Sequence, residues 1–106
     1  MVKRLVWLDS AINDLIRLRK FIDKNNPIAT KRAAEIIREA AIDLIKFPLL
    51  GKPVNDFVDY RDLFIRFGLS GYILRYRIDE EIIYVIHLRH AKEIEFKLKN
   101  INMDES

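Results

Sequence analysis

The hydrophobic period changes from helical to strand-like in the middle of the chain, and that change constrains its fold more than any other feature. From residue 9 to residue 46 apolar side chains recur at helical spacing. From residue 61 to residue 90 they form short runs rich in β-branched and aromatic residues. The segment between them, KFPLLGKPVNDF, is dense in proline and glycine and indicates a loop. Helices and strands segregated in this way predict an α+β domain.

The first half predicts a pair of helices. In the segment 9–26 one apolar stripe follows Asp9 and Ser10, either of which is expected to cap the helix by accepting a backbone N–H bond. Pro27 cannot continue this helix, but it can open a second one, where its missing N–H has no partner to lose. The second stripe contains several alanines, which allow close approach to a neighbour. So short a turn predicts an antiparallel helical hairpin.

The strands are expected at residues 3–8, 61–67, 71–78 and 81–90. The last three form a meander of antiparallel strands, because only short turns separate them. The order is therefore β-α-α-β-β-β, an antiparallel sheet packed on an N-terminal helical hairpin. The hairpin covers one face of the sheet, and we expect function on the other face.

Composition narrows the possible classes of protein. The 106 residues fit one domain over positions 1–106, with a short helix expected after residue 90 and a flexible tail at 100–106. The chain has no cysteine, which excludes disulfides and sulfur-based zinc sites. We expect no metal and no cofactor. No apolar run reaches the roughly 20 residues of a membrane helix, and the N-terminus does not resemble a signal peptide. The sequence thus predicts a soluble, cytoplasmic protein, and its net charge of +3 weakly favours an anionic partner.

The stretch VIHLRHAKE places Arg89, His90 and Lys92 at the end of the longest apolar strand. These side chains indicate either a site at a sheet edge or a solvated strand end. His87, inside the same strand, is expected to be a core or half-buried residue rather than a ligand.

Two further arginines, Arg75 and Arg77, lie two positions apart on one predicted strand and so project from the same face. Like charges side by side repel unless an anion or a carboxylate lies over them. That counter-charge is either an anionic partner or one of Asp62, Asp79, Glu80 and Glu81. Both alternatives stay open at this stage.

Several segments, in their order and spacing, resemble the toxins of the RelE/ParE superfamily of type II toxin–antitoxin modules. They are VWLDSAINDL, NNPIATKRAAEII, FPLLGKPV, YRDLFIRFG, YILRYRI and VIHLRHAKE, and they span residues 3–93. Arg61, behind Tyr60, matches a position typical of the superfamily, whereas Arg66 fits a solvated strand end equally well. The loop FPLLGKPV and the closing RHAKE look more like the ParE branch.

The resemblance implies an activity. ParE members poison DNA gyrase, whereas RelE members cleave messenger RNA inside the ribosome. No tyrosine follows Tyr84, and the loop before the strands holds only Lys46 and Lys52, so the chain departs from the cleaving pattern. We therefore expect a toxin that inhibits DNA gyrase. A ribosome-dependent messenger RNA endoribonuclease, with His90 and Arg89 as catalytic residues, stays an alternative, as does a non-toxic remnant that only binds its antitoxin.

The resemblance also implies partners. We expect a cognate antitoxin whose C-terminal segment folds on the toxin as an amphipathic helix or an added strand. Operator DNA would be bound only through that antitoxin, and no membrane is involved. The gyrase, or the ribosome with its message, would be contacted by target-binding residues, which we expect to be Arg61, Arg75, Arg77, Arg89 and Lys92.

Overall fold

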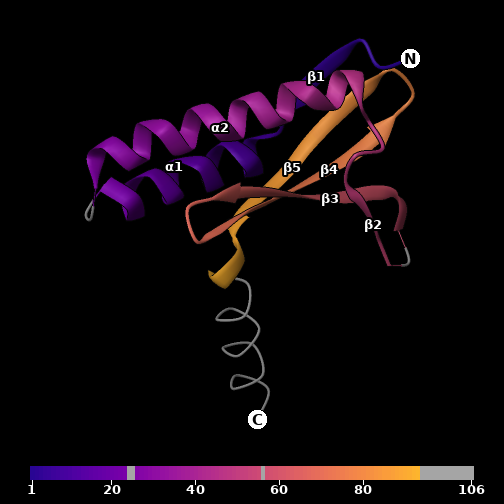
Figure 1. The fold of residues 1–106 in the computed structure, drawn as a ribbon. Coiled ribbons are helices and arrows are strands. Elements are labelled where there is room, and N and C mark those ends of the chain that lie inside the picture. The colour runs from indigo at the N-terminus through magenta and orange to yellow at the C-terminus, as the bar shows by residue number, and fades with distance from the viewer. Residues whose placement is uncertain (24–25, 56, 94–106) are drawn as a thin grey trace.

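The computed structural model describes residues 1–23, 26–55 and 57–93 of the chain. In chain order its elements are β1 (Arg4–Trp7), α1 (Asp9–Asp23), α2 (Pro27–Lys46), β2 (Lys52–Val54), β3 (Phe57–Phe67), β4 (Ser70–Asp79) and β5 (Ile82–His90) (Figure 1). The expected flexible tail at 100–106 lies outside the described residues, as does most of the expected C-terminal helix. No described helix is long and apolar enough to cross a membrane.

The helical hairpin forms at the predicted turn. The Asn26 side chain accepts a hydrogen bond of 3.1 Å from the Ala29 backbone N–H, and Pro27 occupies the first turn of α2. The expected cap does not form: Asp9 and Ser10 both lie inside α1, and neither side chain makes a capping bond within the described residues. The Ser10 hydroxyl instead donates to the Ile86 carbonyl at 2.6 Å. Ser10 therefore ties the helix to the sheet.

The sheet has five strands in the order β1-β5-β4-β3-β2, and two of its features differ from the prediction. The β1 strand pairs with β5 in parallel, so the sheet is mixed and not wholly antiparallel. The segment Lys52–Val54, expected to be loop, forms the edge strand β2 beside β3. The edge position explains how this strand accommodates Pro53. Proline has no backbone N–H to donate, and at an edge that group would face solvent. The α+β class itself is confirmed.

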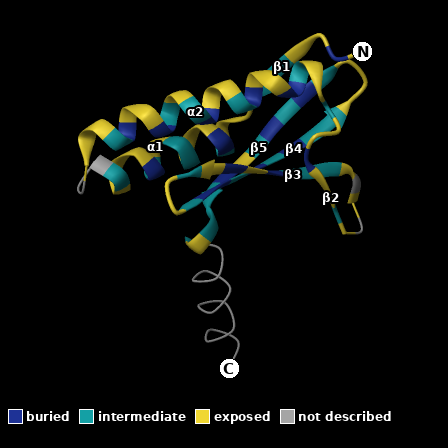
Figure 2. Ribbon diagram, in the orientation of Figure 1, coloured by how far each residue is buried: buried dark blue, intermediate teal, exposed yellow. Residues whose placement is uncertain are grey.

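The two helices cover one face of the sheet, and the core lies between them and that face (Figures 1 and 2). Its most deeply buried side chains come from α2, β4 and β5 and include Ile37, Leu44, Leu74, Tyr76, Ile83, Val85 and Leu88. The predicted alternation in β4 is confirmed, because Tyr72, Leu74 and Tyr76 are buried in this core. Arg75 and Arg77 therefore project from the opposite face, which the helices leave open.

Candidate functional site

The open face of the sheet carries a carboxylate held between two arginines. The strand register places Asp62 of β3 opposite Arg75 of β4. The guanidinium of Arg75 donates from Nε to Asp62 Oδ1 at 2.8 Å and from Nη2 to Oδ2 at 3.0 Å. This bidentate pair fixes both side chains, and its hydrogen bonds raise the pKa of Arg75. Of the counter-charges considered for Arg75, the structure thus supplies Asp62.

Arg89 approaches the same carboxylate from β5, with its Nη2 3.7 Å from Asp62 Oδ2. Its Nε is buried and has no hydrogen-bond partner within residues 1–23, 26–55 and 57–93. Burial lowers the pKa of Arg89, and the neighbouring charge of Arg75 lowers it further, against the attraction of Asp62. Two cations therefore share one carboxylate, which leaves a net positive charge on this part of the sheet.

Arg77 lies in the next row of the same face, between Tyr60 of β3 and Tyr84 of β5. Its guanidinium carbon is 5.9 Å from the centre of the Tyr60 ring, a cation–π contact. Its Nε is buried without a hydrogen-bond partner, and no carboxylate in the described part of the chain forms an ion pair with it. A hollow of about 340 Å³ opens beside it, lined by Leu8, Tyr60, Arg77, Asp79, Tyr84 and Ile86. This arginine can accept an anion from a partner.

The β5 strand continues past the end of its partner β1, and a side chain of α1 binds the strand edge that is left there. Asp14 Oδ2 accepts a hydrogen bond of 3.0 Å from the Leu88 backbone N–H and lies 3.0 Å from Nδ1 of His87. Burial raises the pKa of Asp14, but these two hydrogen bonds and the nearby charge of Arg17 lower it more, so the net shift is downward. His87 was expected to be a core or half-buried residue; it is exposed instead and bound to Asp14.

The cationic strand end divides between two sides of the sheet. His90 stands opposite Tyr72 in the register and packs edge-on against its ring, with 5.5 Å between ring centres. Its Nδ1 accepts a hydrogen bond of 3.1 Å from the Lys92 backbone N–H. Burial lowers the pKa of His90, and the charge of Lys92 adds to this. Arg89 stands opposite Ile73, one residue along, and so points to the other face. Arg89 and His90 are adjacent in the sequence but lie on opposite faces of the sheet.

His90 and Lys92 instead line a hollow of about 530 Å³ beside α1. The other side chains around it are Arg17, Leu18, Phe21 and Glu93, and Arg17 forms an ion pair with Glu93. The Lys92 side chain is exposed.

Arg61 is placed away from the arginines of the open face. It stands opposite the buried Tyr76, and its Nη1 donates to the carbonyls of Gly51 at 2.6 Å and Leu49 at 3.3 Å. Its guanidinium thus holds the loop that follows α2. Arg66 is exposed on β3. Among the described residues no group of three His, Cys, Asp or Glu side chains could hold a metal ion.

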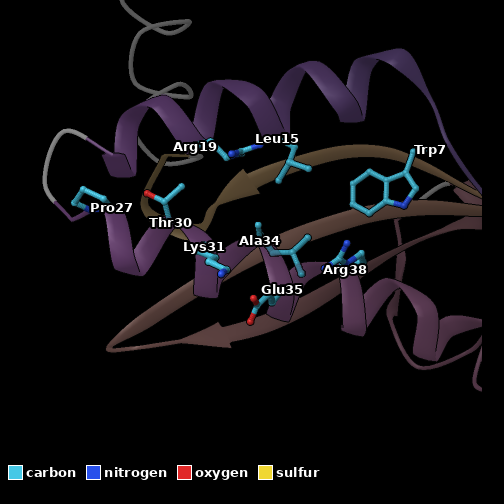
Figure 3. A pocket seen from close by; sticks show the side chains of 10 residues that line it. Trp7, Leu15, Arg19, Pro27, Thr30, Lys31, Ala34, Glu35 and Arg38 are labelled. Atoms are coloured by element: carbon cyan, nitrogen blue, oxygen red, sulfur yellow. The ribbon is translucent and has the colours of Figure 1, made fainter.

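A third hollow, of about 520 Å³, lies between α1, α2 and the end of β1 (Figure 3). Its lining combines apolar side chains with three cations and one carboxylate: Trp7, Leu15, Arg19, Pro27, Thr30, Lys31, Ala34, Glu35, Ile37 and Arg38. Figure 3 shows Trp7 at one end and Pro27 at the other. We call this hollow the helical groove. Trp7 was expected to be core packing, and it is half-buried against the core while also lining this groove.

Sequence reasoning missed the roles of Asp14 and of the two tyrosines beside Arg77. A lone aspartate on a helix carries no signal that it will cap a strand edge. The row Tyr60, Arg77 and Tyr84 needs the strand register, which no local pattern supplies.

Comparison with known protein families gives a match over residues 5–95 to the family described as the ParE toxin of the type II toxin–antitoxin system, parDE. Two curated relatives come from Caulobacter vibrioides. Toxin RelE3 is 31% identical over 83 residues, 78% of this chain and 88% of the relative. Toxin RelE2 is 26% identical over 91 residues, 86% of this chain and 98% of the relative.

Two solved structures share the fold. The chromosomal ParDE TA system from P. aeruginosa has a TM-score of 0.68 at 17% identity, covering 85% of this chain and 96% of that one. The toxin–antitoxin complex RelBE2 from Mycobacterium tuberculosis has a TM-score of 0.55 at 24% identity, covering 85% and 99%. At these identities the likeness extends to the fold alone.

Proposed function

The chain belongs to the ParE toxin family of type II toxin–antitoxin systems, and from this premise we propose that it inhibits growth by binding DNA gyrase. It performs no covalent chemistry itself, and a cognate antitoxin neutralises it. It acts in the cytoplasm, where its target lies, and one domain carries the activity. Such toxins can stabilise the plasmid that encodes them.

The observation that carries this proposal is the divergence of Arg89 and His90. Cleavage of RNA needs an acid, a base and a cation that converge on one phosphate within hydrogen-bond reach. In this chain Arg89 turns toward Asp62, while His90 packs against Tyr72 on the other side of the strand. Lys92 lies with His90, and its backbone N–H already occupies Nδ1 of that imidazole. This arrangement suits a binding surface better than an acid–base pair.

We assign target binding to the open face of the sheet. Arg77 forms no ion pair with any carboxylate of the described residues, and Arg89 shares the carboxylate of Asp62 with Arg75. An anionic group of the target would lower the electrostatic cost of burying these guanidinium groups. Arg61 and Lys92 lie outside this cluster, and Arg61 acts by positioning the loop after α2.

The helical groove is our proposed landing site for the antitoxin. Its floor is apolar and three of its four charged side chains are cationic, which favours an amphipathic segment with carboxylates. On α1, Ile12 and Ile16 are one turn apart and 41% and 47% exposed, so this helix presents further apolar surface. Operator DNA is reached only through the antitoxin.

The alternative function is a ribosome-dependent endoribonuclease. The names of the two curated relatives, Toxin RelE3 and Toxin RelE2, favour it. In that case His90 and Arg89 are the catalytic candidates. The third alternative, a non-toxic remnant, predicts a folded chain that binds its antitoxin and leaves growth unchanged.

The decisive experiment induces the chain in bacteria without antitoxin and pulse-labels DNA and protein synthesis in parallel. Early loss of DNA synthesis with continuing translation supports the gyrase proposal, and purified gyrase should then lose supercoiling activity. Early loss of protein synthesis would overturn it in favour of the ribonuclease.

Variants sharpen this test. Arg77→Ala is expected to reduce toxicity, whereas Arg32→Ala, which removes an exposed arginine of α2 outside the helical groove, serves as the matched control. His90→Ala should stay toxic if the protein binds gyrase. It should lose toxicity if His90 is a catalytic residue.

A further inference from the structure

Three exposed apolar side chains cluster at the end of α2, far from the hairpin turn (Figure 1). Phe47, Leu49 and Leu50 are 60%, 67% and 56% exposed. We call them the loop patch. Single exposed apolar residues are common on protein surfaces, whereas a contiguous group marks an interaction site. Whether the loop patch is such a site depends on how firmly its backbone is held.

The backbone beneath the loop patch is held by two side chains of the sheet. Tyr76, which is fully buried, donates its hydroxyl to the Pro48 carbonyl at 2.7 Å and accepts the Gly51 N–H at 2.9 Å. Arg61 donates to the carbonyls of Leu49 and Gly51. The loop is thus fixed from below while its apolar side chains face solvent.

A fixed backbone changes what exposed leucines can do. Binding by a mobile loop loses free energy because the loop must be ordered, and a loop held in advance avoids most of that loss. Apolar side chains on such a fixed backbone can anchor in a partner's pocket, because their burial removes apolar surface from water at little ordering cost. The hydrogen bonds of Tyr76 and Arg61 would serve any loop, but they do not account for the exposure of Leu49 and Leu50.

The charges around the loop patch indicate the chemistry of its partner. Lys46 and Lys52, both exposed, flank the three apolar residues in the sequence, and Arg61 holds the backbone between them. The register places Lys52 opposite the carboxylate of Asp62. Asp43, one turn earlier on α2, is the acidic side chain of this helix end. The balance is positive, so the complementary surface is an apolar pocket bordered by carboxylates. A second copy of this chain is a poor occupant, because its own loop patch has the same positive border and like charges would face each other.

We propose that the loop patch is the anchor by which this toxin docks on its protein target, through a carboxylate-rimmed apolar pocket of that target. This inference rests on the proposed function, because the target is the gyrase that the toxin inhibits. The loop patch lies beyond the helical groove, which ends at Arg38, so docking and neutralisation use different surfaces.

The test compares a double variant, Leu49→Ser with Leu50→Ser, with the control Leu69→Ser. Leu69 is fully exposed in the turn between β3 and β4 and lies outside the loop patch. Each purified protein is assayed for inhibition of gyrase supercoiling, for antitoxin binding and, on induction, for growth arrest. The double variant should inhibit at least about 30-fold less, bind antitoxin normally and cause little arrest. The control should match the unchanged protein throughout.

Each other result has a fixed meaning. Unchanged inhibition by the double variant overturns the inference and leaves the gyrase proposal standing. Loss of antitoxin binding together with inhibition also overturns it, since the loop patch would then belong to the antitoxin interface. If the unchanged toxin does not inhibit gyrase, the proposed function fails, and growth arrest alone decides whether the loop patch docks another protein target.

A second variant covers the case in which the double variant does not fold. Lys46→Glu with Lys52→Glu keeps the loop patch and reverses its rim. At least tenfold weaker target binding supports the acidic pocket, and unchanged binding overturns it.

Discussion

The hydroxyl of Tyr76 should stabilise the fold by holding the loop after α2, and Tyr76→Phe removes only that group. The ring is fully buried, and its oxygen bridges the Pro48 carbonyl and the Gly51 N–H at 2.7 and 2.9 Å. Position 51 fits only glycine beside this hydroxyl, because a Cβ there would lie 2.8 Å from the tyrosine oxygen. The substitution therefore leaves two backbone groups without their partner.

The expected loss follows from the burial of those two groups. A buried donor or acceptor left unsatisfied costs about 1–3 kcal/mol. The Gly51 N–H is buried and should lose close to this full amount, whereas the Pro48 carbonyl is only partly buried and can accept from water. We expect the free energy of unfolding to fall by about 2–4 kcal/mol. A domain of this size has about 5–15 kcal/mol in total, so the variant should still fold.

Urea unfolding measures this loss, followed by the fluorescence of Trp7, the single tryptophan, and by circular dichroism. The midpoint should fall at an unchanged slope. Tyr84→Phe is the matched control, because no hydrogen bond of the Tyr84 hydroxyl is present among the described residues, and it should change stability by less than about 0.5 kcal/mol. A loss for Tyr76→Phe no larger than that of the control would refute the reasoning. So would undiminished hydrogen-exchange protection of the Gly51 amide.

Three further predictions concern the sheet. Asp62→Asn should lower the unfolding free energy by about 1–2 kcal/mol, because Arg75 and Arg89 lose the carboxylate that they share and solvent screens part of the loss. Urea unfolding of Asp62→Asn, Arg75→Met and the double variant should show that the two losses are not additive. Gly71→Ala should cost about 1–3 kcal/mol in thermal unfolding, since its Cβ would lie 2.5 Å from a backbone carbonyl oxygen of β3. NMR titration should give His90 a pKa below 6.5. Because the unfolded chain then binds that proton more readily, stability should fall as pH drops from 6.5 toward the folded pKa, and His90→Asn should remove this slope.

The sequence alone identified the parts of the fold that depend on local pattern. The helices, the three long strands and the Pro27 turn each have a periodicity or a breaking residue that determines them. The faces of β4 follow from alternation, which correctly separated Arg75 from Tyr76.

The remaining parts depend on long-range pairing. The parallel contact of β1 with β5 joins residues nearly 80 positions apart, as in the pair Arg4 and Ile82. The β2 strand was missed because Pro53 argues against a strand until its edge position is known. Arg89 and His90, neighbours in the sequence, lie on opposite faces of β5 because side chains alternate along a strand, and their predicted roles stay predictions.

Two neighbouring pairs in the middle of the sheet connect the loop patch with the charged face. On β3 and β4 the register sets Arg61 opposite Tyr76 and Asp62 opposite Arg75. The first pair holds the loop beneath Leu49, and the second forms the bidentate ion pair of the open face. Because each strand supplies one residue of each pair, any shift of β3 against β4 would disturb both surfaces together. Both proposed contacts with the target therefore depend on a single register. Within these pairs Arg61 positions the loop through its bonds to the carbonyls of Leu49 and Gly51, and its contact with the target stays a prediction.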